Sequence, residues 1–533
     1  MSLAKIKKQV FKNMSISDSI IPTSINTDIQ KERQNATFNV EEFAEWWHGG
    51  VEKLKFKRFV DSYILEGTTE DPYRLQHSAH DEIYASGIKA SIKVATKLRK
   101  LQEIRNPGGV DIWPGLYLSS QLWGALPRAN PFSVHFAIAL DAIRKQGTDE
   151  QFEMYGKRAE NLEICFAFAQ TELGHGTYLR GLETRADFER ATDEFVMNTP
   201  TISSYKWWPG GSSSIAYKLT AVKLRQLFNE ISLELKQGKY ERVPELHAVS
   251  CCMKVLSSKD AAAGAERLRL ACGGHGYLNS SGLASIYLDA TAACTYEGEN
   301  TVLLMTVGRY LMKMYRFACD GKMLPPSAEY LCEALRAGES VKWTGSWTNM
   351  LKILQTTAAS KLRLAFENYL DGRNDGLSES DALSNAGIGV TQAAELHARC
   401  FVASTFFEEI TGPQSKIRSP HLNQVMENLL ELFLLNTVGQ QLSHVLRIIN
   451  MSAEDLCSLQ KRLENALKKI RPEAVAICDG FDWHNRNLVS TLGCYDGNVY
   501  ERIFEAAKSN PLNKQPVPEV FHTDLRPFLK SKI

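Results

Sequence analysis

Glu297 is the carboxylate of this 533-residue chain that best suits general-base chemistry. Tyr296 before it offers an apolar wall, and Gly298 after it opens space in the backbone. A carboxylate shielded by apolar neighbours has a raised pKa, closer to the range that a general base needs. The alternative is that Glu297 only lies outside the positive end of a helix over 302–315, with Asn300 as the N-cap. Spacing alone favours this second interpretation.

The stretch from Gln170 to Gly211 carries residue types that suit a flat ligand with polar edges. Thr171 can donate its hydroxyl hydrogen to an acceptor-rich ring or a phosphate, and the Trp207–Trp208 pair offers flat faces. Three glycines allow positive φ and a close approach of the backbone to a ligand: Gly174, Gly176 and Gly181. The alternative is a surface segment of hairpins with buried tryptophans.

Two histidines, His175 and His275, each lie between glycines. A histidine in such a loop can be a ligand or a base, but it is more often a hydrogen-bonded loop residue. The 11 cysteines show no spacing typical of zinc, so we expect no metal site.

The composition is that of an ordinary soluble globular protein, with 44% hydrophobic and 23% charged residues. The formal net charge of +1 favours neither nucleic acid nor an anionic membrane surface. A chain of this length predicts roughly three or four domains. The richest apolar run, 429–435, is too short to span a membrane and contains a carboxylate.

Two features bear on where the protein works. No apolar segment typical of a secretory signal follows Met1, so the scattered cysteines indicate a reducing compartment inside the cell. The C-terminal Ser531-Lys532-Ile533 resembles the peroxisomal signal Ser-Lys-Leu, with isoleucine in place of leucine.

Most of the chain shows the three- and four-residue spacing of amphipathic helices. Thr148 and Gln151 fit a capping box, which places a helix start just before Tyr155. The clearest apolar stripe consists of Leu224, Leu227, Phe228, Ile231 and Leu235. Long helices are also predicted over 246–270, 350–369, 390–410, 422–449 and 453–470.

Residues 160–211 show the sequence patterns that most clearly predict β-strands in this chain. Ile164, Phe166 and Phe168 alternate as in a strand, and Phe188 and the run 195–197 flank a turn as in a hairpin. A sheet of so few strands is marginal by itself. The predicted fold class is mainly α with a small β insert.

Seven blocks of the sequence, in the same order, resemble the peroxisomal acyl-CoA oxidases. Several specific blocks in order, from near residue 35 to the C-terminus, are far stronger than a single motif. The blocks are 169–177 (AQTELGHGT), 179–184 (LRGLET), 206–211 (KWWPGG), 244–248 (PELHA), 271–277 (ACGGHGY), 296–301 (YEGENT) and 495–500 (YDGNVY).

The resemblance implies an FAD enzyme that oxidises a fatty acyl-CoA with O₂ to trans-2-enoyl-CoA and H₂O₂. It implies a homodimer in the peroxisome, imported by a receptor that binds Ser531-Lys532-Ile533. By residue match, Thr171 and Gly210 would contact FAD and Glu297 would be the catalytic base. The loop from Gly273 to Tyr277 would lie near the flavin and the acyl chain.

The chain departs from the family after Gly211. Only residues 212–215 precede a segment, 216–219, that resembles a point well inside the family's helical bundle. Most of the central β-domain is therefore missing, together with an arginine-containing segment that would reach FAD across the dimer. We expect a β fragment with unpaired edge strands and a flavin site that lacks several walls.

The implied division is an N-terminal helical domain (1–160), a truncated central β-domain (161–214), a helical bundle with the catalytic Glu (215–324) and a C-terminal helical domain (325–533). Two other functions remain. One is an inactive truncated isoform that dimerises with the full-length oxidase and modulates it. The weaker one is an acyl-CoA dehydrogenase that passes electrons to a flavoprotein.

Overall fold

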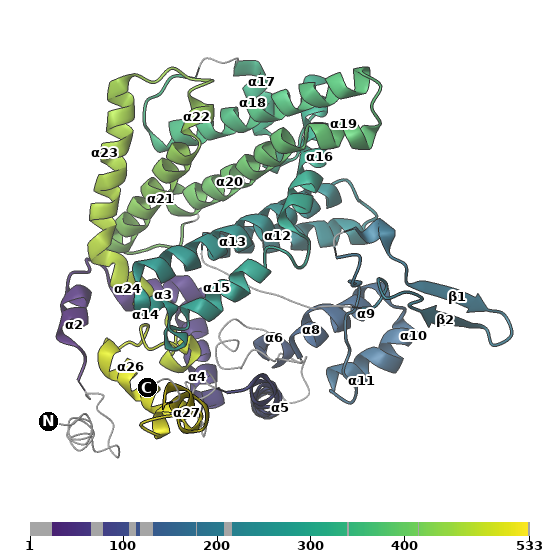
Figure 1. Cartoon of the computed structure of the whole chain (residues 1–533). Coiled ribbons are helices and arrows are strands. Elements are labelled where there is room, and N and C mark those ends of the chain that lie inside the picture. Colours follow the sequence, from purple (N-terminus) through teal and green to yellow (C-terminus); the bar gives the residue numbers. More distant parts are fainter. Residues whose placement is uncertain are drawn as a thin grey trace.

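A computed structural model describes residues 24–65, 78–105, 113–117, 132–176, 178–206, 216–337, 341–413 and 415–530. Helices dominate these residues, and a single two-stranded hairpin projects from one side (Figure 1). The prediction of a mainly α fold with a small β insert is confirmed.

The N-terminal elements between residues 51 and 160 surround a core of their own. Leu98, Tyr117 and Leu140 are among its most deeply buried side chains. Thr148 forms the predicted capping box with Gln151, so this part of the prediction is confirmed. The described elements between residues 24 and 160 are α2 (Thr27–Gln34), α3 (Val40–His48), α4 (Val51–Leu65), α5 (His80–Arg105), α6 (Trp113–Tyr117), α8 (Phe132–Val134), the π-turn η2 (His135–Ala139), α9 (Leu140–Gln146), α10 (Asp149–Gln151), the π-turn η3 (Phe152–Gly156) and α11 (Lys157–Glu160).

The hairpin prediction is confirmed as well. Strands β1 (Arg185–Glu189) and β2 (Glu194–Asn198) pair antiparallel, and Asp193 has the positive φ of 58° that the tight turn requires. All residues of both strands are exposed. The strand predicted from Ile164 to Phe168 is wrong: the structure has a bend at Ile164 and no strand over 165–168. Its alternating pattern lacks a neighbouring strand to pair with.

A helical bundle follows the hairpin. The long helix α13 (Val243–Ala271) packs against α12 (Ala216–Lys236), α15 (Leu283–Ala292) and α16 (Asn300–Cys319). The stripe predicted on α12 lies on one helix, but its burial is uneven. Ile231 is buried, whereas Phe228 is 43% exposed.

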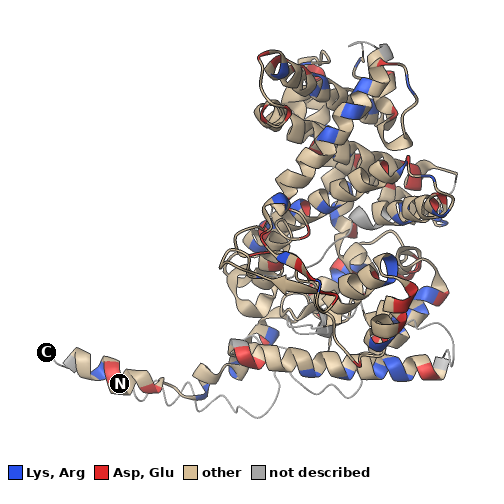
Figure 2. Ribbon diagram, turned by 90° about the vertical axis from the view of Figure 1, so that its right-hand side faces the viewer, with Lys and Arg blue, Asp and Glu red and all other residues tan. Residues whose placement is uncertain are grey.

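The helices between residues 330 and 411 lie above the bundle in Figure 1, whereas those between residues 499 and 530 lie below it. The predicted helix over 422–449 breaks after Gln440 and resumes as a short helix. The main elements are α17 (Tyr330–Ala337), α18 (Trp347–Asn374), α19 (Glu379–Asn385), α20 (Gly387–Thr411), α21 (Pro420–Gln440), α22 (Leu442–Val445), α23 (Ala453–Ile470), α24 (Ala474–Gly480), α25 (Asn485–Leu488), α26 (Val499–Ser509) and α27 (Arg526–Lys530). Figure 2 shows the C-terminal end extending away from the body.

Two further cores hold the bundle and the C-terminal helices together. One joins α13 and α16 to α18 and α20, and the other lies among α18, α20, α21 and α23 with α3. Helices α18 and α20 contribute to both cores, so the bundle and the C-terminal helices are packed as a continuous unit. The four-domain division itself stays a prediction.

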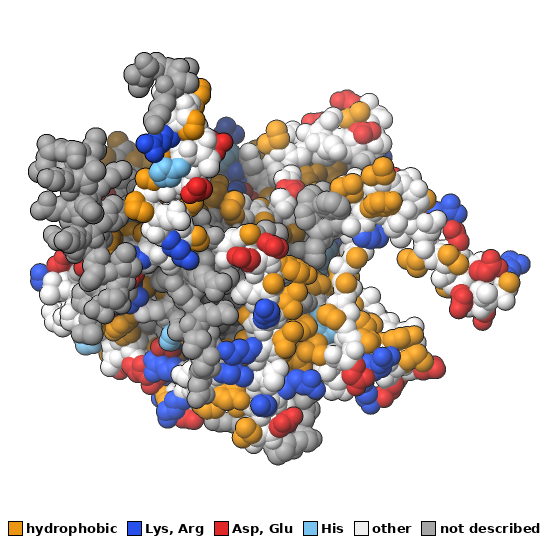
Figure 3. Space-filling model, turned by 60° about the horizontal axis from the view of Figure 1, so that its bottom comes forward, with side chains coloured by type: hydrophobic (Ala, Val, Ile, Leu, Met, Phe, Trp, Pro, Cys, Tyr) orange, Lys and Arg blue, Asp and Glu red, His pale blue; other side chains and the backbone are white. Residues whose placement is uncertain are grey.

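In the part of the chain that the structure describes, the helices are all too short or too polar to cross a membrane. Exposed apolar side chains nevertheless gather on the face shown in Figure 3, beside the arm that ends in the hairpin.

Candidate active site

Glu297 lies in the short turn that joins α15 to α16. Its backbone is left-handed, with φ of 54°, and Gly298 continues the turn with φ of 98°. The amide of Asn300 donates to the carbonyl oxygen of Cys294 at 3.1 Å, which closes the turn. A positive φ at a residue with a Cβ is strained and marks positions that the surrounding structure must hold in place.

Glycine is required at position 298 for a second reason. A Cβ atom there would lie 2.7 Å from Cδ2 of Leu303, on the first turn of α16. The turn can therefore approach the helix only because residue 298 has no side chain.

Glu299, and not Asn300, is the N-cap of α16. Its carboxylate accepts hydrogen bonds from the amides of Thr301 at 2.9 Å and Val302 at 3.1 Å. The prediction of Asn300 as the N-cap is wrong, because a carboxylate one residue earlier reaches the free amides. The helix end thus already has its acidic residue, and Glu297 is not needed there.

Lys254 on α13 holds the same turn from the other side. Its Nζ donates to the carbonyl oxygen of Gly298 at 2.5 Å and to Oδ1 of Asn300 at 2.9 Å. Ser258, one turn further along α13, shares the Asn300 side chain through hydrogen bonds of 3.1 and 3.2 Å. Lys254 was not predicted from the sequence. The available signal was a lone lysine within the otherwise apolar run from Cys251 to Leu256.

The pKa values of Glu297 and Lys254 are shifted in directions that suit a general base at Glu297. Partial burial raises the pKa of Glu297, and the nearby ammonium of Lys254 opposes that rise. Burial lowers the pKa of Lys254, and the neighbouring groups of Cys294, Glu297 and Glu299 oppose that fall. Glu297 as a whole residue is nonetheless exposed, so solvent and a substrate have access to it.

The loop that carries Thr171 is organised by its neighbour Glu172. The Glu172 side chain is fully buried and accepts hydrogen bonds from the amides of Glu183 at 2.9 Å and Thr184 at 2.8 Å. His175 Nδ1 lies 2.9 Å from the same carboxylate, and Lys206 Nζ lies 3.3 Å from it. His175 is therefore a hydrogen-bonded loop residue, as the second of the two interpretations expects.

The Glu172 carboxylate is held in its charged form. Burial acts to raise its pKa, but the hydrogen bonds from Thr184, Glu183 and His175 outweigh burial and lower the pKa well below the ordinary value. In the sequence, Glu172 stood out only as part of the block 169–177. An acid within a glycine-rich loop carried too little signal to identify a buried centre.

Thr171 itself is half-buried, and among the described residues its hydroxyl has no hydrogen-bond partner. Thr171 and Glu297 lie on separate elements and share no hydrogen bond in the described residues. Gly210 and the Trp207–Trp208 pair lie outside the described residues, as does the Ser531-Lys532-Ile533 tail.

The loop from Gly273 to Tyr277 ends α13 and forms the short helix α14 (Gly274–Tyr277). The His275 ring lies 6.2 Å from the ring of Tyr500 on α26, which belongs to the C-terminal part of the chain. The neighbouring turn is held by Thr491, whose amide donates to the carbonyl oxygen of Ser280 at 2.8 Å. The C-terminal region thus supports this side of the bundle.

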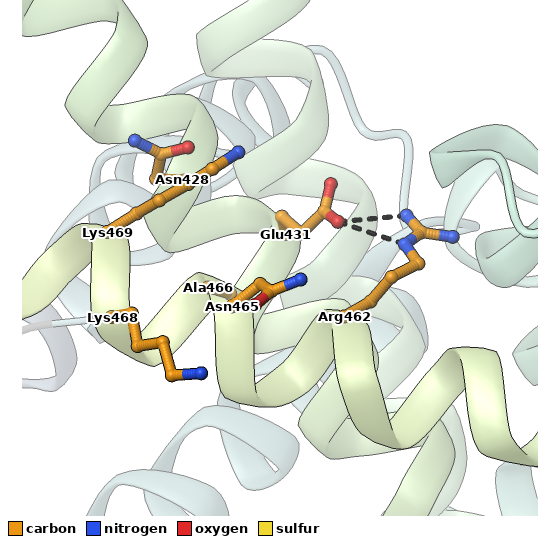
Figure 4. A pocket seen from close by; sticks show the side chains of 7 residues that line it. All are labelled: Asn428, Glu431, Arg462, Asn465, Ala466, Lys468 and Lys469. Carbon is orange, nitrogen blue, oxygen red and sulfur yellow. Dashed lines mark hydrogen bonds and ion pairs between the residues drawn. The ribbon is translucent and has the colours of Figure 1, made fainter.

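A hollow of about 380 Å³ lies elsewhere, between α21 and α23 (Figure 4). All its lining residues except Ala466 are polar or charged, and Arg462 among them already pairs with Glu431 at 2.9 Å. An acyl chain needs an apolar wall, so this hollow does not suit one. Its lining residues are Asn428, Glu431, Arg462, Asn465, Ala466, Lys468 and Lys469.

Comparison with known protein families gives three matches along the chain. They are "Acyl-coenzyme A oxidase N-terminal" at residues 39–165, "Acyl-CoA oxidase, C-alpha1 domain" at 185–312 and "Acyl-CoA oxidase" at 346–530. The Glu297 turn and Lys254 both fall in the second match.

Curated relatives match over nearly the whole chain. Acyl-coenzyme A oxidase 1 of Drosophila melanogaster is 33% identical, with 96% of this chain and 99% of the relative covered. Peroxisomal acyl-coenzyme A oxidase 1 of Rattus norvegicus is 26% identical, with 96% and 100% covered. The Drosophila alignment spans 666 positions although this chain has 533 residues, so well over a hundred positions of the relative have no counterpart here.

Solved structures share the fold. Acyl-CoA oxidase-2 of Caenorhabditis elegans, whose structure holds FAD, ascaroside-CoA and ATP, gives a TM-score of 0.85 at 23% identity, with 96% of this chain and 98% of that chain covered. Arabidopsis thaliana acyl-CoA oxidase 1 gives 0.84 at 21% identity, with 96% and 100% covered. The helical framework is therefore retained.

Proposed function

Because this chain belongs to the acyl-CoA oxidase family, we propose that it oxidises a fatty acyl-CoA to trans-2-enoyl-CoA, with Glu297 as the catalytic base and FAD as the cofactor. The carrying observation is the Glu297 turn. A carboxylate with a raised pKa projects from a strained turn that glycine, a lysine and a capped helix hold in place.

Glu297 removes a proton from the carbon α to the thioester carbonyl. Partial burial raises the pKa of Glu297 and so makes its carboxylate a stronger base than one in water, while the charge of Lys254 opposes that rise. Hydrogen bonds that polarise the thioester oxygen increase the acidity of the α carbon. Thr171 and Gly210 would hold FAD, which would supply the acceptor for the hydride from the β carbon and the route for its electrons to O₂, with H₂O₂ as the product.

The loop around Thr171 fits one edge of that cofactor. Its hydroxyl lacks a partner among the described residues, and the buried Glu172 network keeps the loop in one conformation. A free donor on a fixed loop suits the acceptor atoms of a flavin ring. Gly210 would approach the same group through its backbone. The chain acts as a homodimer in the peroxisome, imported through Ser531-Lys532-Ile533.

The direct test is purification and assay. The expected protein is yellow, with a flavin absorbance spectrum, and it produces H₂O₂ from a fatty acyl-CoA in the presence of O₂. Glu297→Gln keeps the flavin and loses turnover by roughly a thousandfold or more, because the amide cannot accept the α proton. A colourless protein that is inert to acyl-CoAs of every chain length contradicts the proposal.

A second experiment separates the base from the redox step. The thioester 3,3-dimethylbutanoyl-CoA has α hydrogens but no β hydrogen, so it cannot lose a hydride. When it is deuterated at the α carbon, Glu297 should exchange the label with water, and mass spectrometry follows the loss. Equal exchange by the wild type and Glu297→Gln would remove Glu297 from the proposed role.

A further inference from the structure

We propose that Lys254 is a positioning residue for Glu297: its ammonium ties the Glu297 turn to α13 and keeps the Glu297 carboxylate charged and correctly aimed. This inference rests on the proposed role of Glu297. The geometry that carries it lies in the contacts of Lys254 with Gly298 and Asn300.

Lys254 contacts the backbone of the Glu297 turn. Left-handed backbone at Glu297 is unfavourable, so the turn needs contacts that select it. The bond from Lys254 Nζ to the Gly298 carbonyl fixes the peptide unit immediately after Glu297. The bond to Asn300 Oδ1 fixes the first residue of α16. Lys254 therefore spans the turn on the C-terminal side of Glu297.

Partial burial of the Lys254 ammonium costs free energy. Lys254 is half-buried, and its neighbours Met253, Val255 and Leu256 lie in the apolar core. Partial removal of an ammonium from water is unfavourable unless the group is paired, and an apolar residue of similar size is often tolerated as well or better. Stability alone therefore does not explain a lysine here, whereas a catalytic turn that needs a cation does.

The positive charge of Lys254 lies close to several ionisable groups. The ionisable groups that act on Lys254 most strongly are Cys251 on its own helix and Cys294, Glu297 and Glu299 in the turn. Burial raises the pKa of the Cys251 thiol, so Cys251 stays neutral at physiological pH. Glu299 already bonds the amides at the start of α16. The charge of Lys254 is therefore available to Glu297.

The test compares three variants. Lys254→Met keeps the length and the apolar stem but removes the charge and the donors. Lys254→Arg keeps the charge. Lys259→Met is the matched control, since Lys259 lies on the same helix but pairs at the surface with Glu395 at 2.8 Å.

The first measurement is amide hydrogen exchange over residues 294–303, which does not depend on activity. Lys254→Met should exchange at least about tenfold faster in this segment than the wild type, because the turn loses two of its tethers. Lys259→Met should match the wild type. Unchanged exchange in Lys254→Met overturns the inference whether or not the protein is active.

The second measurement is the pH profile of kcat/KM. Without the ammonium the acidic limb, which reports ionisation of Glu297, should move up by about one pH unit, with kcat falling more than KM changes. Lys254→Arg should keep the limb near its wild-type position. A limb in Lys254→Met that coincides with that of Lys259→Met overturns the inference, even when Glu297→Gln is inactive and the proposed function stands.

Discussion

At the scale of single residues, two buried or partly buried carboxylates have opposite surroundings. Glu172 is surrounded by donors, so its pKa is lowered and it stays charged as a structural centre. Glu297 meets partial burial and one cation, so its pKa is raised and it can exchange a proton. Environments that separate the pKa values of two acids in this way divide structural from chemical roles.

Glu172→Gln should loosen the loop that carries Thr171. The amide keeps the shape but loses the charge that Lys206 and the amides of Glu183 and Thr184 share. We expect faster hydrogen exchange over residues 171–184 and a lower flavin content. Glu189→Gln, on the exposed hairpin, is the control and should change neither. A variant that retains full flavin and normal exchange would show that the network is dispensable.

The same carboxylate predicts a pH effect. Because the pKa of Glu172 is lowered on folding, its stabilising contribution is complete above its ordinary value of 4.5 and is lost as the pH falls below that value. The exchange rate over 171–184, divided by the intrinsic exchange rate at each pH, should therefore rise between pH 5 and about pH 3 in the wild type. The rise should be smaller in Glu172→Gln.

At the scale of elements, the turn between α15 and α16 depends on Gly298. Gly298→Ala forces a Cβ against Leu303 and places alanine at φ of 98°. We expect a loss of about 1–3 kcal/mol in the free energy of unfolding, together with a strong fall in kcat. Urea denaturation and steady-state assays measure the two effects.

Gly264→Ala is the control for that substitution. Gly264 lies within α13, and a Cβ there meets no atom within 4 Å among the contacts of the described residues. Alanine should leave stability unchanged or raise it by up to about 1 kcal/mol, because it favours the helix. Equal losses in Gly298→Ala and Gly264→Ala would contradict the special role of the turn.

The hairpin exposes apolar side chains that favour association between molecules. Phe195, Val196 and Met197 are 68%, 55% and 67% exposed on β2, and the two-stranded sheet leaves edges open to pairing. We expect concentration-dependent association of the purified protein. Val196→Lys should reduce it by adding charge to the strand, with no loss of the melting temperature. Light scattering at several concentrations measures the effect, and Lys236→Met, on α12, is a surface control.

At the scale of the whole molecule, the two cores that share α18 and α20 enclose His397. Tyr330 lies 3.0 Å from its Nδ1, and Nε2 has no partner among the described residues. Burial lowers the pKa of His397 from 6.5 to about 4. The folded state therefore favours the neutral imidazole of His397, and protonation of this side chain destabilises the folded state.

The stabilising contribution of neutral His397 should accordingly be fully present above pH 6.5. The free energy of unfolding should decline as the pH falls from 6.5 towards 4. The decline amounts to a few kcal/mol, since one pKa unit corresponds to about 1.4 kcal/mol. His397→Gln removes the titration, so its unfolding free energy should depend less steeply on pH in this window. Denaturation at a series of pH values compares the slopes, and identical slopes would contradict the prediction.

The sequence by itself determined the helical framework, the capping box, the hairpin and the family. These features follow from local spacing and from motifs of a few adjacent residues, which a single chain displays directly. It also indicated Glu297, Thr171 and Gly210, and their roles stay predictions. The break after Gly211 was visible as a missing segment.

Only the tertiary structure decided which groups meet. Lys254 lies 43 positions before Glu297 along the chain, so no local pattern joins them, and packing of α13 against α16 brings them together. The burial of Glu172 and of His397 likewise depends on segments far apart in sequence. The strand expected at Ile164 failed for the same reason, because a strand exists only where a partner strand lies beside it.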